Sequence, residues 1–258
     1  MYSYCYYYSF TEIMIDYSQS LCRNSPRSCL EIAKTQKLPL SNRYYWIYDR
    51  ATCNQAYPHY FVIYCDFTSQ QGYAWTLIQS FSRDKNTDSQ IHKAFINDRS
   101  VNSDNPHHHW SYYRMTRSQM LSVYNGDQSV SRRPLWRATC NFLSLSRPFP
   151  SSPRDVIYSS FSSFNILNST STPFCTIIDY VNIRGYRRRS GSYSIEYDPF
   201  RLHVEGSAGA FYCNYQLPTS TPNAHYFGSY GIASYDVEFS CTRSSSSTTN
   251  FWFGALIS

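Results

Sequence analysis

Four arginines lie close together and form the densest group of side chains in this sequence that could bind a ligand. Arg184 precedes the run Arg187, Arg188 and Arg189. Guanidinium groups bind sulfates and carboxylates through paired hydrogen bonds, so these residues predict a surface for acidic polysaccharides. The alternative is a solvated loop that binds no ligand.

A second group has the residue type of a metal site but not its spacing. His107, His108 and His109 are adjacent, and three adjacent side chains cannot converge on one ion without strain. Asp104 is the acidic neighbour that could add a ligand. We therefore expect an exposed loop at these residues and no metal.

Catalytic motifs are absent from the sequence. It contains no Gly-x-Ser-x-Gly elbow, no His-Glu-x-x-His helix, no phosphate loop and no Gly-x-Gly-x-x-Gly turn. The scattered Ser, His and Asp residues do not define a triad. We expect a protein that is not an enzyme and has no cofactor.

The composition favours β structure. Aromatic residues supply 18% of the chain, with 26 Tyr, 16 Phe and 5 Trp. Of the five tryptophans, Trp75, Trp136 and Trp252 are expected in the core. The formal net charge of +6 suggests acidic partners. We expect no nucleic acid among them, because no nucleic-acid-binding motif accompanies the charge.

Nine cysteines are spread along the chain without a Cys-x-x-Cys pair, which favours disulfides over zinc and implies an oxidising, extracellular compartment. The odd count leaves one thiol that is either free or paired with another chain. Asn168 begins the glycosylation sequence Asn-Ser-Thr, which agrees with secretion.

The first 20 residues lack the basic and apolar regions of a signal peptide. The chain is then a fragment, a mature form, or one whose start is misassigned. No stretch approaches the roughly 18 apolar residues of a membrane helix, so we expect no membrane span.

Local patterns predict short helices among many strands. Capping boxes at Ser28 and Thr116 predict helices over 28–34 and 116–125, the second ending at Asn125 and Gly126. A polar turn is expected at 68–72 and a flexible turn at 243–250. Alternating or β-branched runs predict strands at 44–49, 59–67, 73–81, 135–143, 155–166, 173–183 and 235–241.

These elements show no strand–helix–strand rhythm, so the expected fold is α+β and mainly antiparallel, with short helices and disulfide staples. We expect a lead-in rich in Tyr and Ser over 1–25, followed by one domain over 26–258.

The segments SCLEIAKTQ, YYWIYD and YCDFTSQQGYAWTLIQSF resemble the opening of fibrinogen C-terminal-like domains. The later segments WSYYRMTRSQML, LWRATCNF, YVNIRGY and STTNFWFG are similar to a divergent cnidarian branch of secreted fibrinogen-like proteins, which includes proteins of the coral skeletal organic matrix. This resemblance implies that Cys29 pairs with Cys65. Chain order alone suggests bridges from Cys140 to Cys175 and from Cys213 to Cys241, which leaves three cysteines unassigned.

The sequence departs from this family at its calcium and acetyl-binding site. No Asp-x-Asp occurs in the second half, and the nearest carboxylates, Glu196 and Asp198, flank Tyr197. Glu196 and Asp198 could contribute to a residual calcium site, which takes six to eight oxygen ligands, and the alternative is an exposed strand edge. The late cysteines, Cys213 and Cys241, do not enclose the family's usual small loop.

These features together predict a secreted extracellular matrix protein that binds acidic polysaccharides or other matrix proteins. The resemblance implies a role in a skeletal organic matrix and in biomineralization. An odd cysteine could cross-link its chains. The alternative is a secreted lectin for acetylated glycans, which would need a concave pocket with aromatic walls.

Overall fold

The computed structural model describes residues 19–36, 40–55, 58–88, 91, 95, 98–103, 109–144, 155–168, 174–197, 202–206, 213–217, 225–228, 230 and 236–257. Its main helices are α2 (Cys29–Thr35) and α3 (Arg117–Val130). The strands are β1 (Arg43–Tyr48), β2 (Tyr60–Asp66), β3 (Tyr73–Ser82), β4 (Tyr112–Arg114), β5 (Leu135–Cys140), β6 (Val156–Ser160), β7 (Phe174–Ile183), β8 (Tyr186–Tyr197), β9 (Leu202–Glu205), β10 (His225–Tyr226) and β11 (Thr248–Leu256).

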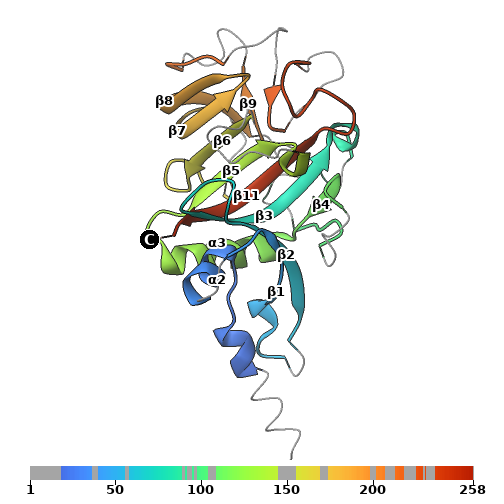
Figure 1. Cartoon of the computed structure of the whole chain (residues 1–258), viewed down its shortest axis with the longest axis vertical. Helices are drawn as coiled ribbons and strands as arrows, with labels where there is room; N and C mark the ends of the chain where they lie inside the picture. The colour runs from blue at the N-terminus through green and yellow to red at the C-terminus, as the bar shows by residue number, and fades with distance from the viewer. Residues whose placement is uncertain are drawn as a thin grey trace, which may run out of the picture.

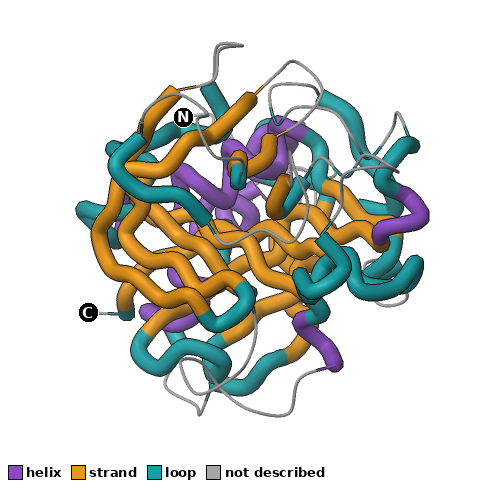
Figure 2. Tube along the Cα trace, turned by 90° about the horizontal axis from the view of Figure 1, so that it is seen from above, coloured by secondary structure: helices purple, strands orange, loops and turns teal. Residues whose placement is uncertain are grey.

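Within the described residues, the strands form one 11-stranded antiparallel sheet in the order β1-β2-β3-β11-β5-β6-β7-β8-β9-β10, with β4 paired to β3. The sheet extends from β1 and β2 at one end of the molecule to β8 and β9 at the other (Figure 1). Viewed from above, neighbouring strands form a continuous layer (Figure 2). The structure is therefore mainly antiparallel β with short helices, as expected.

The strands predicted between residues 44 and 183 are confirmed, although several end earlier than expected. The strand predicted at 235–241 is wrong, because residues 237–242 form turns. Asp236 organises these turns: its carboxylate accepts from the Glu238 amide at 2.9 Å, and its carbonyl accepts from the Phe239 amide at 3.2 Å. An aspartate that bonds to the backbone two residues on favours a turn over a strand.

The C-terminal strand β11 lies between β3 and β5, in the middle of the sheet. The expected flexible turn at 243–250 is thus only partly a turn, since residues 248–250 already belong to β11. Trp252 on this strand is fully buried, and Trp75 and Trp136 are also buried, which confirms all three as core residues.

Both predicted helix starts are confirmed. Ser28 Oγ accepts from the Glu31 amide at 3.2 Å, but the Glu31 carboxylate accepts from the Arg27 amide at 2.6 Å, so this is not a reciprocal capping box. Thr116 and Gln119 form a complete one, with bonds of 3.0 and 2.9 Å.

The predicted end of the second helix at Gly126 is wrong, because α3 continues to Val130. Gly126 instead permits close packing of α3 on α2. A Cβ atom at this position would lie 3.0 Å from Arg27 Cβ and 3.2 Å from Ser28 Oγ. The two helices also pack on β3 and β11 (Figure 1).

Four disulfides link the described cysteines. The bridge from Cys29 to Cys65 is confirmed. The two bridges inferred from chain order are wrong, because the sheet places other cysteines side by side. The observed pairs are Cys140–Cys241, Cys175–Cys213 and Cys22–Cys53.

The bridge between Cys22 and Cys53 ties a helical turn at residues 19–24 to the domain. The ninth cysteine, Cys5, lies outside the described residues. Within the described part of the chain, no helix combines the length and apolar character needed to span a membrane.

Candidate functional site

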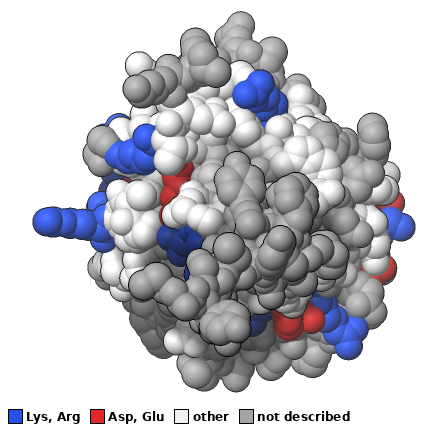
Figure 3. Space-filling view, turned by 90° about the horizontal axis from the view of Figure 1, so that it is seen from below, with Lys and Arg blue, Asp and Glu red and all other residues white. Residues whose placement is uncertain are grey.

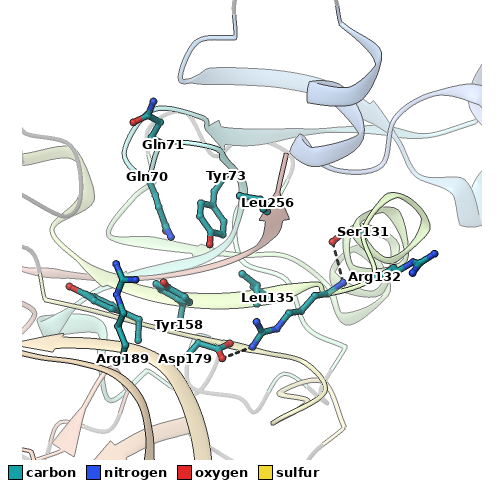
Figure 4. Close-up of a pocket in the computed structure, with 12 residues that line it drawn as sticks. Gln70, Gln71, Tyr73, Ser131, Arg132, Leu135, Tyr158, Asp179, Arg189 and Leu256 are labelled. Carbon is teal, nitrogen blue, oxygen red and sulfur yellow. Dashed lines mark hydrogen bonds and ion pairs between the residues drawn. The ribbon is translucent and has the colours of Figure 1, made fainter. Parts of the chain in front are cut away.

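A cavity of about 640 Å³ opens on the sheet where β3, β5, β6, β7 and β8 meet the end of α3. Figure 4 shows its lining, with Tyr73, Tyr158 and Arg189 directed toward the same space and Arg132 directed away from it. We call this cavity the tyrosine–arginine cleft. Its lining residues are Gln70, Gln71, Tyr73, Ser131, Arg132, Arg133, Leu135, Tyr158, Asp179, Tyr180, Arg189 and Leu256.

Strand register creates the aromatic wall of the cleft. Tyr158 on β6 lies opposite Tyr180 on β7, and Tyr180 lies opposite Arg189 on β8. The rings of Tyr158 and Tyr180 stack with centroids 5.4 Å apart and planes 15° apart. Tyr73 adds a third ring, with its centroid 6.4 Å from that of Tyr158. The wall is thus a stacked pair, Tyr158 and Tyr180, with Tyr73 tilted by 48° against Tyr158, and it ends at the cation of Arg189.

The hydroxyls of Tyr158 and Tyr180 stay protonated at neutral pH. Burial raises the pKa of Tyr158 to about 12, and it raises the pKa of Tyr180 as well. Nearby Arg189 opposes the rise at both residues. These hydroxyls therefore act as neutral hydrogen-bonding groups.

The cleft carries a net positive charge. Among the described residues, Arg132, Arg133 and Arg189 line it, against the one carboxylate of Asp179. Arg133 forms an ion pair with Asp179 at 2.5 Å. No carboxylate among the described residues pairs with Arg189, whose side chain is exposed. Arg132 is exposed and has no ion pair in the described part of the chain either, but its side chain points away from the cleft (Figure 4), so Arg189 is the cation best placed to receive an anionic ligand.

A buried ion pair supports the turn that supplies Gln70 and Gln71 to the cleft. Asp66 and Arg137 are paired at 2.9 Å with almost no solvent exposure. The Asp66 carboxylate also accepts from the amide of Ser69 at 2.9 Å. Burial would raise the pKa of Asp66, but the Arg137 guanidinium and the bonds from Ser69 outweigh it and lower the pKa.

Arg137 in turn lies between two indole rings. Its guanidinium carbon is 4.5 Å from the ring centroid of Trp75 and 4.6 Å from that of Trp252. Trp75 stacks on Tyr73 with centroids 5.7 Å apart. The core therefore connects directly to the wall of the cleft, and it fixes the orientation of Tyr73.

The structure separates the four predicted arginines. None is in a loop without regular structure: Arg187, Arg188 and Arg189 lie on β8, and Arg184 lies in the turn before it. Because side chains alternate along a strand, Arg187 and Arg189 share one face and Arg188 points to the other. The guanidinium carbon of Arg188 lies 3.7 Å from the ring centroid of Tyr215.

Arg184 has a structural role. It pairs with Asp236 at 2.8 Å and with Glu238. Its backbone has φ of 52°, and the following Gly185 has φ of 83°, as a tight hairpin turn requires. Arg184 and Arg187 line a second cavity of about 360 Å³, which also contains Glu238. The four arginines are thus divided between the two faces of β8 and the turn before it, and their binding of acidic polysaccharides stays a prediction.

The charged side chains of one face can be seen in Figure 3. On the face seen in Figure 3, Lys and Arg side chains stand apart from one another and do not form a continuous patch.

The glycosylation site, the histidine group and the late carboxylates were the other predicted sites. Asn168 is exposed, as glycosylation requires. Asp104, His107, His108 and Asp198 lie outside the described residues. The alternative of an exposed strand edge at Glu196 is wrong, because this residue lies on β8 opposite His203 of β9.

Sequence reasoning did not find the tyrosines of the cleft. Tyr158 is the one half-buried residue in the otherwise buried strand β6. A tyrosine in an apolar strand is a weak signal, because such residues are common in the core. Only the pairing of β6 with β7 and β8 brings Tyr158, Tyr180 and Arg189 together.

Comparisons with protein-family models, with curated proteins and with solved structures gave no match for this chain. The resemblance to fibrinogen C-terminal-like domains therefore rests on the sequence segments alone.

Proposed function

We propose that this chain is a secreted, non-enzymatic extracellular matrix protein with a fibrinogen C-terminal-like domain, and that it binds acidic polysaccharides in the tyrosine–arginine cleft. The observation that carries the proposal is the stacked pair of Tyr158 and Tyr180 beside the exposed Arg189. A stacked aromatic pair next to a cation matches a sugar ring that carries a sulfate or carboxylate.

The dimensions and chemistry of the cleft support this ligand class. Its volume of about 640 Å³ lies within the usual range for sites that hold a small ligand or a short segment of a polymer. The cleft is open, so a chain can extend past Arg132 and Arg133 of its lining. Arginine forks bind sulfates and carboxylates bidentately.

The covalent structure supports an extracellular location. Four disulfides fit an oxidising compartment, and Asn168 is accessible for glycosylation. With the other eight cysteines paired, Cys5 is the residue through which chains would cross-link. A role in a skeletal organic matrix, and so in biomineralization, follows from the resemblance to cnidarian proteins.

A lectin for acetylated glycans is the second candidate. The observation that favours it is the pair of side-chain amides, Gln70 and Gln71, at the rim of the aromatic wall. Amide groups hydrogen-bond an acetamido group without requiring charge. The two candidates therefore differ in how binding depends on salt.

Arg189 should contribute directly to the binding of an anionic polysaccharide. We expect Arg189→Ala to weaken binding of a sulfated polysaccharide about tenfold, since a hydrogen bond to a charged group contributes roughly 1.5 kcal/mol. The matched control is Arg188→Ala, which removes the same charge from the opposite face of β8 and should leave binding unchanged. Binding is measured by titration calorimetry at several salt concentrations.

Two further variants sharpen this test. Asp179→Asn removes the carboxylate of the cleft and should strengthen binding severalfold, whereas Tyr158→Ala should weaken it. Equal effects of Arg189→Ala and Arg188→Ala would contradict the proposal. Salt-independent binding of acetylated sugars, lost in Tyr158→Ala but not in Arg189→Ala, would support the lectin.

A further inference from the structure

Two histidines and two glutamates converge at the edge of the sheet formed by β8, β9 and β10. Strand register places His203 opposite Glu196, and Glu205 opposite His225. His203 and Glu205 are two residues apart on β9, so their side chains project from the same face. We call these four residues the His–Glu cluster. None of them lines the tyrosine–arginine cleft.

Their ligand atoms lie at distances that one ion can bridge. His203 Nε2 is 3.2 Å from Glu196 Oε2 and 4.0 Å from Glu205 Oε2, and His225 Nδ1 is 3.1 Å from Glu205 Oε2. One ligand atom from each of His203, Glu205 and His225 lies within 4.8 Å of the other two. Ligands of a tetrahedral zinc ion stand about 3.3 Å apart, so small side-chain rotations suffice.

The cluster is largely shielded from solvent. The side chains of His203 and Glu205 are 5% and 8% exposed, and that of His225 is 21% exposed. A buried carboxylate is costly unless a partner offsets its charge. A divalent cation would offset the charge of both Glu205 and Glu196, which lies at the rim with 36% exposure.

The ring geometry suits a shared ligand. The imidazoles of His203 and His225 have centroids 4.4 Å apart and planes 76° apart. This edge-to-face arrangement allows one nitrogen from each ring to face a common point. Two imidazole nitrogens with a carboxylate oxygen form a ligand set typical of zinc, whereas calcium takes oxygen ligands alone.

We propose that His203, Glu205 and His225 bind one divalent transition-metal ion of the zinc class, with Glu196 as the fourth ligand. The ion joins three neighbouring strands. It fastens β10, which has only two residues, and the short strand β9 to β8. The site therefore acts as a staple for this edge of the sheet, independently of polysaccharide binding.

The test measures zinc bound to the full-length, disulfide-intact chain. The protein is stripped with a chelator, loaded with Zn²⁺, desalted and examined by native mass spectrometry, and the affinity is obtained by calorimetry. The variants are His225→Ala and the isosteric Glu205→Gln. Two controls retain the cluster: His59→Ala, and the triple variant His107→Ala, His108→Ala, His109→Ala, which removes the other group of histidines.

We expect one zinc ion per chain in the wild type and in both controls, and a loss of affinity of more than about 100-fold in His225→Ala and Glu205→Gln. Removing a metal ligand should lower the affinity for zinc by more than the 10- to 100-fold loss that follows when a residue hydrogen-bonded to a ligand is changed. Zinc should also raise the melting temperature of the wild type but not of Glu205→Gln, which keeps the test valid if His225→Ala does not fold.

Three outcomes would overturn the proposal. One is a wild-type chain that retains no zinc, which means that the cluster is held by His–Glu hydrogen bonds alone. Another is zinc binding that survives both cluster variants but is lost in the triple variant. The third is displacement of zinc by a small excess of calcium, which would exclude nitrogen ligands.

Discussion

At the scale of single residues, the neighbouring groups decide whether a buried aspartate is ionised. Asp66 is stabilised as a carboxylate by Arg137. Asp127 on α3 is fully buried in a different environment, close to Ser28 and to the ion pair of Arg27 and Glu31 on α2. One aspartate therefore stays charged, and the other is held neutral.

Asp127 makes the stability of the fold depend on pH. Burial raises the pKa of Asp127 to about 8, the Glu31 carboxylate adds to the rise, and the Ser28 hydroxyl opposes it. The folded pKa exceeds the unfolded one, so this contribution to stability is complete below about pH 4 and is lost as the pH rises toward 8.

We expect Asp127→Asn to be more stable than the wild type at neutral pH. Its advantage should grow by up to about 1.4 kcal/mol per pH unit between pH 4 and 8. Urea unfolding at a series of pH values measures this difference. Asp98→Asn, on the surface, is the control, and an advantage for Asp127→Asn that does not change with pH would refute the assignment.

At the scale of elements, β11 determines how the sheet is built. It pairs with β3 on one side and β5 on the other, and its register shifts between Phe251 and Trp252. At Gly254 the neighbouring backbone approaches closely: a Cβ atom here would collide with the carbonyl oxygen of Ala74 and would meet the Trp75 ring at 2.9 Å. The glycine is thus required by packing.

Gly254→Ala should destabilise the protein by at least about 2 kcal/mol, because the added methyl group must displace the backbone of β3. Ala255→Gly, the next residue on the same strand, removes a methyl group and should cost about 1 kcal/mol. Chemical denaturation gives both values. If Gly254→Ala were no more harmful than Ala255→Gly, the close approach of β11 to β3 would be wrong.

At the scale of the whole molecule, disulfides connect segments that are distant in sequence. Cys140 at the end of β5 bonds to Cys241, 101 residues later, and Cys175 bonds to Cys213, 38 residues later. Both bridges restrict the unfolded chain, and the longer loop restricts it more.

Peptide mapping of the unreduced protein should recover linked peptides for Cys22 with Cys53 and for Cys140 with Cys241. Replacing Cys140 and Cys241 together by serine should destabilise the fold by about 4.7 kcal/mol, as expected for closure of a loop of about 100 residues. The corresponding change at Cys175 and Cys213 should cost about 1 kcal/mol less. Recovery of a Cys140–Cys175 peptide would contradict the observed topology.

The sequence by itself predicted the features that depend on neighbouring residues. Runs of β-branched and aromatic residues located β1, β2, β3, β5, β6 and β7 but not β4, β8, β9, β10 or β11. The hydroxyls of Ser28 and Thr116 located both helix starts, because these patterns act over a few residues. The helix end at Gly126 was misplaced, since a glycine that permits close packing has the same local signature as one that ends a helix.

Only the tertiary structure decided which distant residues meet. The pairing of β6, β7 and β8 brings Tyr158 beside Tyr180 and Arg189, and that of β8, β9 and β10 brings Glu196 to His203 and Glu205 to His225. The partner of Cys140 was decided in the same way. The physical reason is that strand order depends on burial and register over the whole sheet, which no local pattern encodes.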